Sequence, residues 1–467
     1  MSSVVDQPQP EQLASGPAVV LAPREGPLAV LRLSVARRMA TAWFLNHFAL
    51  GAWFVTIGSY IKANTDREGA GIFADGFMGT ATMAAPIGAM VAPFLTGVLA
   101  DRFFATERLM MLLHLVAAAM LWLGSAATTQ QGFFLAIIAF FLCYVPTMSL
   151  MAAMSMHHLP NPARQYSVVR GCGTIGWIAA GVVVGTLCPA ILGGSIERTT
   201  LPMKLGAVAE LLGACYCFAL PSTPPSRALR NLTPGKLAQP ESGKLFRNGS
   251  FLCVLAVAFL TIIPSQAYYG YLNAFMNWRG APHAATRMTL GQVTEVACML
   301  LLPVILMRIG LRAAVLVGAV AWVVRYGLLA LAAATGGQAW AIYLAIALHG
   351  IAFTFVSISL QLEVESLVDK RRRGTAQGLL SVASQGIGCL AGAWLAATAE
   401  TVWLPGGLGE TTAGGWARFW LGPFVLGVIA LLAAAALLPT PGGEQAPGDL
   451  TPAEPSGPPS SVSHDET

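Results

Sequence analysis

Residues 286–307 read TRMTLGQVTEVACMLLLPVILM, and within them Gln292 and Glu295 are separated by three positions. The segment is long and apolar enough to cross a bilayer as a helix, which takes about 20 residues. Positions three apart share one face of a helix, so the amide and the carboxylate are expected side by side. A carboxylate inside a membrane helix costs roughly 2.5–3.5 kcal/mol on insertion scales and usually marks a substrate or proton pathway. The alternative is a carboxylate that only joins two helices.

The composition of the whole chain indicates many such segments. Of its 467 residues 55% are hydrophobic and 10% are charged, and the mean hydropathy is +0.64. Soluble domains carry about 25% charged residues, so this composition predicts an all-α integral membrane protein and excludes a soluble enzyme. The eight cysteines lie in or beside apolar runs without a CxxC spacing. We interpret them as small buried side chains and expect no metal site.

Twelve transmembrane helices are predicted, in two halves of six. They cover about 39–61, 77–100, 109–127, 132–155, 168–192, 204–220, 250–275, 286–307, 312–334, 338–362, 374–398 and 417–438. A polar cytoplasmic linker, 221–249, separates a six-helix bundle at 39–220 from a second at 250–438. The tails 1–38 and 439–467 are rich in Pro and polar residues, so we expect both to be disordered and the first to lack a signal peptide.

The basic residues predict the orientation of the chain. With the N-terminus in the cytoplasm, the inside segments hold nineteen Lys and Arg and the outside segments hold seven. Cytoplasmic loops carry the excess of Lys and Arg in membrane proteins. We therefore expect both termini in the cytoplasm.

The two halves resemble each other in sequence. A basic segment follows the second span at 97–102 and the eighth span at 308–312, and the fifth and eleventh spans both open with Arg-Gly, at 170–176 and 373–378. Small residues at such spacing let helix backbones approach closely. The correspondence predicts a parallel duplication of a six-helix unit.

Four charged residues are expected to form a cytoplasmic gate. Asp101 and Arg102 end the segment GVLADR, which resembles a signature of the major facilitator superfamily. Glu365 lies at the cytoplasmic end of the tenth span, and we expect it to pair with the basic cluster that ends at Arg373.

Polar side chains inside the other spans are candidates for a central cavity. Arg170, Thr174 and Trp177 share one helical face of the fifth span, and Gln266 and Tyr269 share a face of the seventh, where Asn273 continues the same stripe. A buried amide without a partner costs about 1–3 kcal/mol, so such a stripe should face water, substrate or another helix. Arg170 could equally be a basic anchor at the cytoplasmic boundary.

Phe353 and Thr354 lie in the middle of the tenth span. Glu210 and Arg325 are ionisable residues within spans to which the sequence alone assigns no role.

Several kinds of chemistry are absent from the sequence. It holds no Gly-x4-Gly-Lys-Ser/Thr phosphate loop, no His-Glu-x-x-His and no Gly-x-Ser-x-Gly. We therefore expect neither ATP-driven transport nor an enzyme, and neither a cofactor nor a nucleic-acid partner.

The sequence resembles the bacterial nucleoside:proton symporter family of the major facilitator superfamily, of the nucleoside permease and xanthosine permease type, over about Phe44 to Leu438. The resemblance is carried by GAWFVTIGSY at 51–60, YVPT at 144–147, RGCGTIG at 170–176, QVTE at 292–295 with Pro303, AWVVR at 321–325 and TAQG at 375–378.

The resemblance implies that a central cavity binds the solute through both halves. Arg170 and Thr174 would contribute from the first half, and Gln266, Gln292 and Glu295 from the second, with Phe353 nearby. Trp177 stands where the family's nucleoside permease has another aromatic residue.

Two positions depart from that permease. Tyr269 replaces an asparagine, and Thr354 replaces an aspartate that is a coupling candidate in the family. Glu295 is then the remaining carboxylate for proton coupling.

These observations predict a monomeric twelve-helix carrier that imports nucleosides with protons by alternating access. The alternative is a carrier of the same fold for another solute, such as a sugar, a nucleobase or a drug, by uniport or exchange, since a fold does not fix a function. A sensor built on a carrier fold is a further alternative, which would need a signalling domain.

Overall fold

The computed structural model describes residues 27–65, 71–91, 104–224, 245–336, 339–369 and 372–438. These ranges are helical and contain no β-strand; their one β-bridge joins Thr65 to Phe73. The elements are η1 (Pro27–Arg32), α1 (Ser34–Phe54), α2 (Ile57–Ala63), α3 (Phe77–Thr82), α5 (Thr106–Ser125), α6 (Gln130–His158), α7 (Pro162–Val182), η2 (Val183–Leu187), α8 (Cys188–Leu192), α9 (Leu201–Tyr216), η3 (Cys217–Ala219), α13 (Gly249–Ile262), α14 (Ser265–Trp278), α15 (Ala284–Thr335), α16 (Ala339–Leu367), α17 (Arg373–Ser381), η5 (Val382–Gly388), α18 (Cys389–Trp403) and α19 (Ala413–Leu437).

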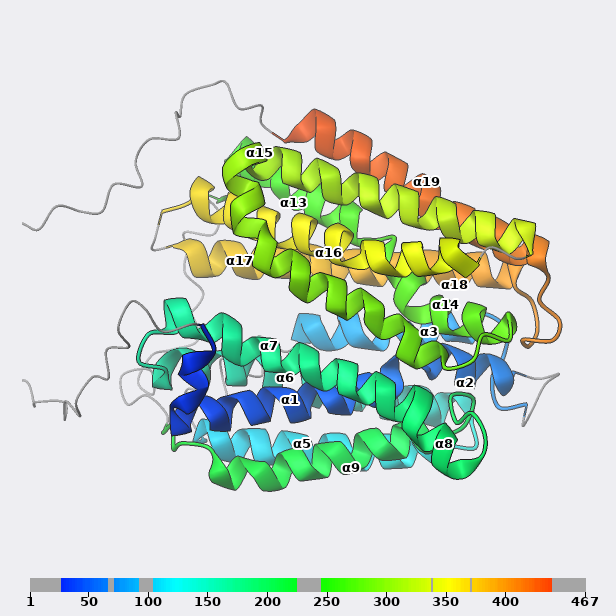
Figure 1. Ribbon diagram of the computed structural model, residues 1–467, viewed down its shortest axis with the longest axis horizontal. Helices are drawn as coiled ribbons and strands as arrows, with labels where there is room; N and C mark the ends of the chain where they lie inside the picture. The colour runs from blue at the N-terminus through cyan, green and yellow to red at the C-terminus, as the bar shows by residue number, and fades with distance from the viewer. Residues whose placement is uncertain are drawn as a thin grey trace, which may run out of the picture.

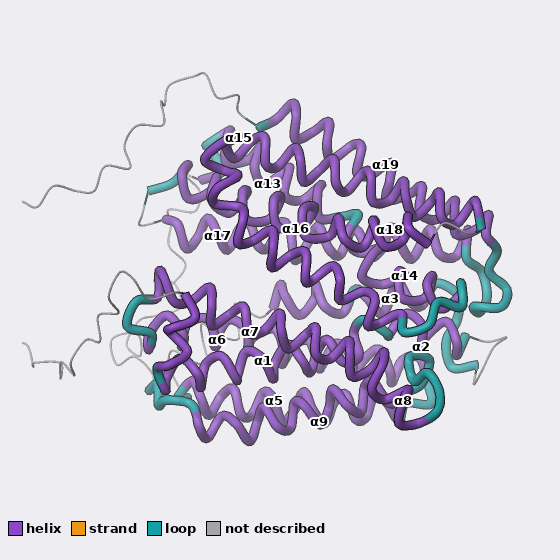
Figure 2. The backbone as a smooth tube through the Cα atoms, viewed as in Figure 1, coloured by secondary structure: helices purple, strands orange, loops and turns teal. Residues whose placement is uncertain are grey.

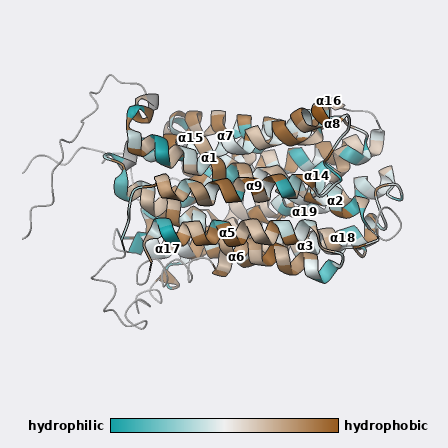
Figure 3. Cartoon of the chain, turned by 90° about the horizontal axis from the view of Figure 1, so that it is seen from below, coloured by the Kyte–Doolittle hydropathy of each residue, from teal (hydrophilic) through white to brown (hydrophobic). Residues whose placement is uncertain are grey.

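The helices are apolar enough to cross a membrane. Ten helices of the described ranges meet the length and composition of a membrane span. The predicted second span corresponds to a shorter apolar helix, Phe77–Val91, and the rest of that span lies outside the described residues. Figure 3 shows hydrophobic residues along most of each helix, and many large ones are exposed, such as Leu300 at 74% and Leu432 at 64%. Such exposed side chains suit contact with lipid tails.

The helix α15 contains two of the predicted spans. Its 52 residues would measure about 78 Å at 1.5 Å per residue, more than twice the hydrocarbon thickness of a bilayer. Gly310 interrupts it with φ 74° and ψ 169°, a conformation that only glycine adopts readily. Figure 1 shows the chain reversing direction there, so the eighth and ninth spans form one tight hairpin.

The helices form two bundles that lie one above the other (Figures 1 and 2). In the N-terminal half, residues 27–224, α1 packs along α7 and α9, and α5 packs along α6 and α9. In the C-terminal half, residues 245–438, α15 packs along α16 and α19. At the end of the molecule away from η1 and the end of α19, the halves meet where α2 contacts α14, α3 contacts α18 and α7 contacts α15.

Interruptions of the helices occur in the corresponding spans of the two halves. The first span breaks between α1 and α2, and the seventh breaks between α13 and α14 at Pro264. The fifth span contains a π-helical turn, Val183–Leu187, and the eleventh contains another, Val382–Gly388. Their occurrence in the same spans of both halves agrees with the predicted duplication, and such turns are frequent at functional sites.

One predicted boundary is wrong. Residues 27–38, placed in a disordered tail from the sequence, form η1 and the first turn of α1. Arg37 donates hydrogen bonds to the carbonyl oxygens of Leu31 (3.2 Å) and Arg32 (2.7 Å), and Val30 packs in the apolar cluster with Met39. The remainder of both predicted tails and the gate residues Asp101 and Arg102 lie outside the described residues.

Candidate functional site

A small cavity lies between the two halves. It encloses about 260 Å³ and is lined by Phe54, Val55 and Trp177 from the N-terminal half and by Tyr268, Tyr269, Met288 and Gln292 from the C-terminal half. Three of these residues, Trp177, Tyr269 and Gln292, were predicted from the sequence. Aromatic walls with a few polar groups are typical of sites for small molecules.

A chain of polar side chains borders this cavity in the C-terminal half. His349 of α16 has its Nε2 atom 3.8 Å from the Glu295 carboxylate and 3.4 Å from the hydroxyl of Tyr269. Its Nδ1 atom lies 3.0 Å from an amino nitrogen of Arg325, which is fully buried. The Glu295 side chain is 18% exposed. The carboxylate is therefore the accessible end of a chain whose other end is a buried cation.

The guanidinium of Arg325 determines where the proton of His349 lies. Arginine can only donate hydrogen bonds, so the Nδ1 atom of His349 accepts. In a neutral imidazole the other nitrogen then carries the hydrogen. His349 consequently offers an Nε2–H donor on the side of Glu295 and Tyr269.

Aromatic rings hold this chain in place. The His349 ring stacks between Tyr268, at a centroid distance of 5.1 Å, and Phe353, at 5.6 Å. The guanidinium carbon of Arg325 lies 3.3 Å from the centre of the Tyr268 ring and 5.1 Å from that of Trp322. Cation–π contacts of desolvated groups are worth about 2 kcal/mol, which helps to retain a buried cation.

Two glycines allow α14, α15 and α16 to meet this closely. A methyl group on Gly350 would overlap the backbone of Thr294, and one on Gly291 would crowd His349 and the Tyr268 hydroxyl. The Gly350 amide also donates to the Thr294 hydroxyl at 3.3 Å. The glycines thus place His349 beside Glu295.

The N-terminal half presents Arg170, Thr174 and Trp177 along α7. The guanidinium carbon of Arg170 lies 5.5 Å from the centre of the Trp43 ring. Thr174 is half-buried, and Trp177 packs edge-on against Phe54 at 6.5 Å. Methyl groups on glycines 173 and 176 would overlap α1, so the Gly-rich fifth span packs as predicted.

Of the nine predicted binding residues, five line neither this cavity nor the second one described below: Arg170, Thr174, Gln266, Glu295 and Thr354. Gln266 is buried, and its amide nitrogen lies 3.4 Å from the Ser265 hydroxyl. Thr354 is 1% exposed, and its hydroxyl has no hydrogen-bond partner among the described residues. Phe353 stacks on His349 and lines a second cavity.

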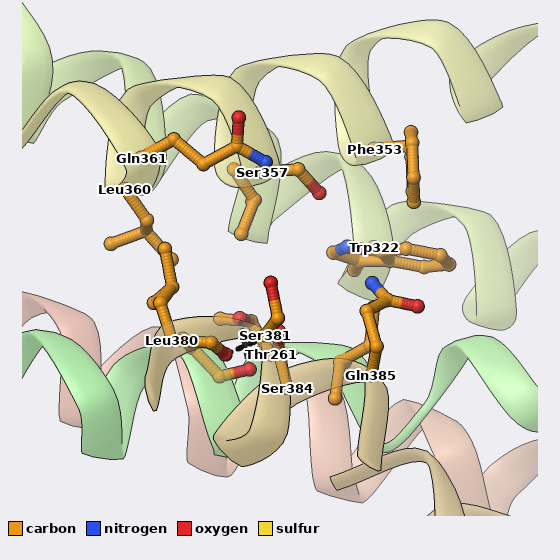
Figure 4. Close-up of a pocket in the computed structure, with 13 residues that line it drawn as sticks. Thr261, Trp322, Phe353, Ser357, Leu360, Gln361, Leu380, Ser381, Ser384 and Gln385 are labelled. Carbon is orange, nitrogen blue, oxygen red and sulfur yellow. Dashed lines mark hydrogen bonds between the residues drawn. The ribbon is translucent and has the colours of Figure 1, made fainter. Parts of the chain in front are cut away.

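That second cavity, here called the vestibule, lies towards α17 and contains about 500 Å³ of empty space, which includes space open to solvent (Figure 4). Figure 4 shows Gln361 and Ser357 on one side, Ser381, Ser384 and Thr261 on the other, and Trp322, Phe353 and Gln385 at one end. Its lining contains hydroxyl and amide groups and no charged side chain. Neutral polar solutes suit such a lining better than ions.

The predicted gate is described in part. Glu365 and Arg373 are both exposed, and the ion pair that the described residues show at this loop joins Arg372 to Asp369 at 3.9 Å. Their gating role stays a prediction.

No group of three or more His, Cys, Asp or Glu in the described ranges could hold a metal ion.

Sequence reasoning missed His349. It lies one turn before Phe353 on the same face of the tenth span, and this spacing could have identified it. Arg325 and Glu210, which had no assigned role, both have histidine partners: Arg325 bonds to His349, and Glu210 lies 2.6 Å from the Nδ1 atom of His114. The Glu210 pair lies within the N-terminal half, between α5 and α9.

Comparison with known proteins adds to this geometry. The sequence model of a family described as nucleoside H⁺ symporter matches residues 33–439. A putative nucleoside transporter of Escherichia coli K12, YegT, is 30% identical over 362 residues, which cover 77% of this chain and 83% of that protein. Xanthosine permease of the same organism is 26% identical over 407 residues, covering 83% and 92% of the two chains.

Solved structures share the fold. The crystal structure of the nucleoside transporter NupG has a TM-score of 0.74 at 24% identity and covers 87% of this chain and 99% of its own. A D-xylose–proton symporter has a TM-score of 0.67 at 14% identity, with coverages of 87% and 98%. At these identities the likeness shows the all-helical facilitator fold.

Proposed function

The chain belongs to the nucleoside H⁺ symporter family, and on that premise we propose that it imports nucleosides with protons through the site around Glu295. It is a multi-pass membrane transporter with the facilitator fold. The proposal places it in a bacterial inner membrane as a monomer with both termini in the cytoplasm. No catalytic step or cofactor is part of it.

The observation that carries the proposal is the polar chain from Glu295 through His349 to Arg325 beside the cavity between the halves. A carboxylate in a desolvated site favours its neutral form, and a nearby donor favours its charged form. Both influences act on Glu295, because the protein shields most of its side chain from water and the Nε2–H group of His349 lies near its carboxylate. A small rearrangement can therefore change its preference for a proton.

The proposed cycle follows from these opposing influences. A proton from the outside neutralises Glu295, which lowers the cost of closing the cavity around it. The nucleoside base stacks against Trp177, and Gln292 and Tyr269 supply hydrogen bonds. The two halves then move about the site. Loss of the proton towards the vestibule leaves a carboxylate that His349 and Arg170 stabilise, which resets the carrier.

The alternative of another neutral solute is favoured by Thr354. Its buried hydroxyl has no hydrogen-bond partner among the described residues, and its position holds an aspartate in the family's nucleoside permease. A neutral residue there weakens any argument for contacts to a ribose. Competition of unlabelled sugars, nucleobases and nucleosides with labelled uridine separates the two solute classes.

The deciding experiment is uptake of labelled uridine and adenosine by cells that express this chain, with and without a protonophore. We expect accumulation that the protonophore abolishes, and a Glu295→Gln variant that equilibrates nucleoside without accumulating it. Glu210→Gln is the matched control, since it removes another buried carboxylate with a histidine partner, which lies within the N-terminal half between α5 and α9. A Glu295→Gln variant that still accumulates nucleoside would contradict the coupling role, and absence of nucleoside uptake would favour the alternative solute.

A further inference from the structure

Buried charges join the two halves at the end of the molecule away from the termini. Lys62 of α2 is fully buried, and its Nζ atom lies 3.0 Å from the carboxylate of Glu400 on α18. The same ammonium donates to the carbonyl oxygens of Leu404 (2.7 Å) and Gly406 (2.9 Å). All three of its hydrogens are therefore directed to acceptors of the other half.

The carboxylate of Glu400 is held from both halves as well. Its second oxygen accepts a hydrogen bond from the Tyr271 hydroxyl at 2.8 Å and one from the Gly79 amide at 3.2 Å. Gly79 belongs to α3 of the N-terminal half, and Tyr271 to α14 of the C-terminal half. A buried ion pair is stable only while both charged partners are present, because removing one of them leaves an uncompensated charge in the interface.

A second carboxylate repeats this arrangement nearby. Glu197, which is 1% exposed, accepts from the side-chain amides of Asn273 (3.0 Å) and Asn277 (2.8 Å) and from the Ala285 backbone amide (2.9 Å). Ser59 donates to Asn273 at 2.5 Å, which adds a further bond between the halves. Asn273, counted from the sequence in the stripe of the seventh span, thus belongs to this contact.

The helix backbones of the two halves are closely packed at this end of the molecule, where α2 meets α14 and α3 meets α18. A methyl group on Gly58 would overlap the Gly270 carbonyl of the other half, and one on Gly79 would overlap Ala397. A carrier that works by alternating access must separate these surfaces once in every cycle.

We propose that Lys62 and Glu400 form the gate that closes this end, and that separating them is the step which opens it. When the halves part, water reaches both charges and replaces their bonds. When only one charge remains, the closed state retains an unpaired buried ion, so the open state gains population. The inference goes beyond the proposed function and depends on the two-half architecture, whatever the solute.

The test measures distances between spin labels in purified protein whose eight native cysteines have been replaced. Gly194→Cys and Gly414→Cys report on the gate end, since both positions are exposed and a side chain there meets open space. Met156→Cys and Gly249→Cys, also exposed, report on the opposite end.

In the Lys62→Met variant we expect the ratio of long to short distances at the gate end to rise at least about tenfold, because loss of one partner of a buried pair is strongly unfavourable. Distances at the opposite end should shorten. Tyr271→Phe removes one hydrogen bond without changing a charge and should shift the ratio in the same direction by less. The double variant Lys62→Met/Glu400→Gln leaves no unpaired charge and should return the ratio towards its starting value.

The matched control is Glu210→Gln, which breaks the buried pair with His114 inside one half. It should lower the melting temperature and leave both distance distributions unchanged. Unchanged gate distances in Lys62→Met and Tyr271→Phe would overturn the proposal. An equal shift in Glu210→Gln, or lengthening at both ends, would overturn it too, since either result would indicate general loosening.

Discussion

At the scale of single residues, the central observation is that a buried cation orients a histidine towards a carboxylate. Arg325 is fully buried, and two of its three guanidinium nitrogens have no hydrogen-bond partner in the described structure. Its bond to His349 is therefore expected to matter for stability as well as for coupling. A double substitution can separate these two roles.

We predict that His349→Phe keeps the stack between Tyr268 and Phe353 and loses proton-driven accumulation. It also leaves Arg325 without its acceptor, which should cost about 2 kcal/mol because hydrogen bonds to charged groups are worth about 1.5–3 kcal/mol. Adding Arg325→Met removes the stranded charge. We expect the melting temperature, measured in detergent, to recover in the double variant while accumulation stays lost.

The control for this prediction is Arg325→Met alone, which leaves His349 free to adopt either tautomer. Recovery of accumulation together with stability in the double variant would show that His349 has only a structural role.

The polar chain shows what the sequence could reveal at this scale. Gln292 and Glu295 could be identified because a carboxylate is rare inside an apolar run. Arg325 was equally conspicuous, but its partner comes from another helix, and sequence spacing reports only on neighbours within one helix. Thr354 was chosen because its position corresponds to an aspartate in the related permease. The structure buries it away from the described cavities, and such burial depends on how several helices pack together, which the sequence of one span does not show.

At the scale of elements, the reversal in α15 depends on one residue. Gly310 has φ 74° and ψ 169°, a conformation essentially restricted to glycine. The sequence predicted two spans here, at 286–307 and 312–334, from hydropathy alone. The prediction left only residues 308–311 between the spans, but it could not show that the reversal is made at a single glycine.

We predict that Gly310→Ala lowers the free energy of unfolding by about 1–3 kcal/mol, the usual cost of a strained backbone conformation. Gly374→Ala is the matched control, because Gly374 lies in the first turn of α17 with open space and no positive φ. Alanine favours helix by up to about 1 kcal/mol over glycine, so the control should be neutral or stabilising. Equal melting temperatures for the two variants would contradict the prediction, because alanine at position 310 would then cost no more than alanine at position 374.

The positions of the helix breaks and of the π-helical turns could not be predicted from the sequence. Pro264 indicated an irregularity in the seventh span, since proline removes a backbone donor. The corresponding break after Phe54 in the first span has no proline. After this break α2 packs against α14, which is far away in the sequence.

At the scale of the whole molecule, the fold class and the two halves followed from hydropathy, basic loops and internal similarity. The contacts between the halves did not. Lys62 and Glu400 each lie near the end of a span, where single charges are common, and nothing in their local sequence indicates that they meet.

We predict that both ends of the chain face the cytoplasm, because nineteen Lys and Arg lie in the segments assigned to that side. Green fluorescent protein fused after the last residue should fluoresce, and alkaline phosphatase fused there should be inactive. Fusions placed after Trp278, between α14 and α15, should give the opposite pair of signals. The same signals at both positions would contradict the predicted topology.

The hairpin of α15 also has a consequence for how the protein is made. Arg312, two residues after Gly310, donates a hydrogen bond of 2.7 Å to the Ala435 carbonyl in the last turn of α19. Basic side chains commonly satisfy the free carbonyl groups at the end of a helix. The ribosome completes α19 only after the spans that precede it have been synthesised. The α15 hairpin therefore gains this hydrogen bond late in synthesis, and a chain that is truncated before α19 lacks it.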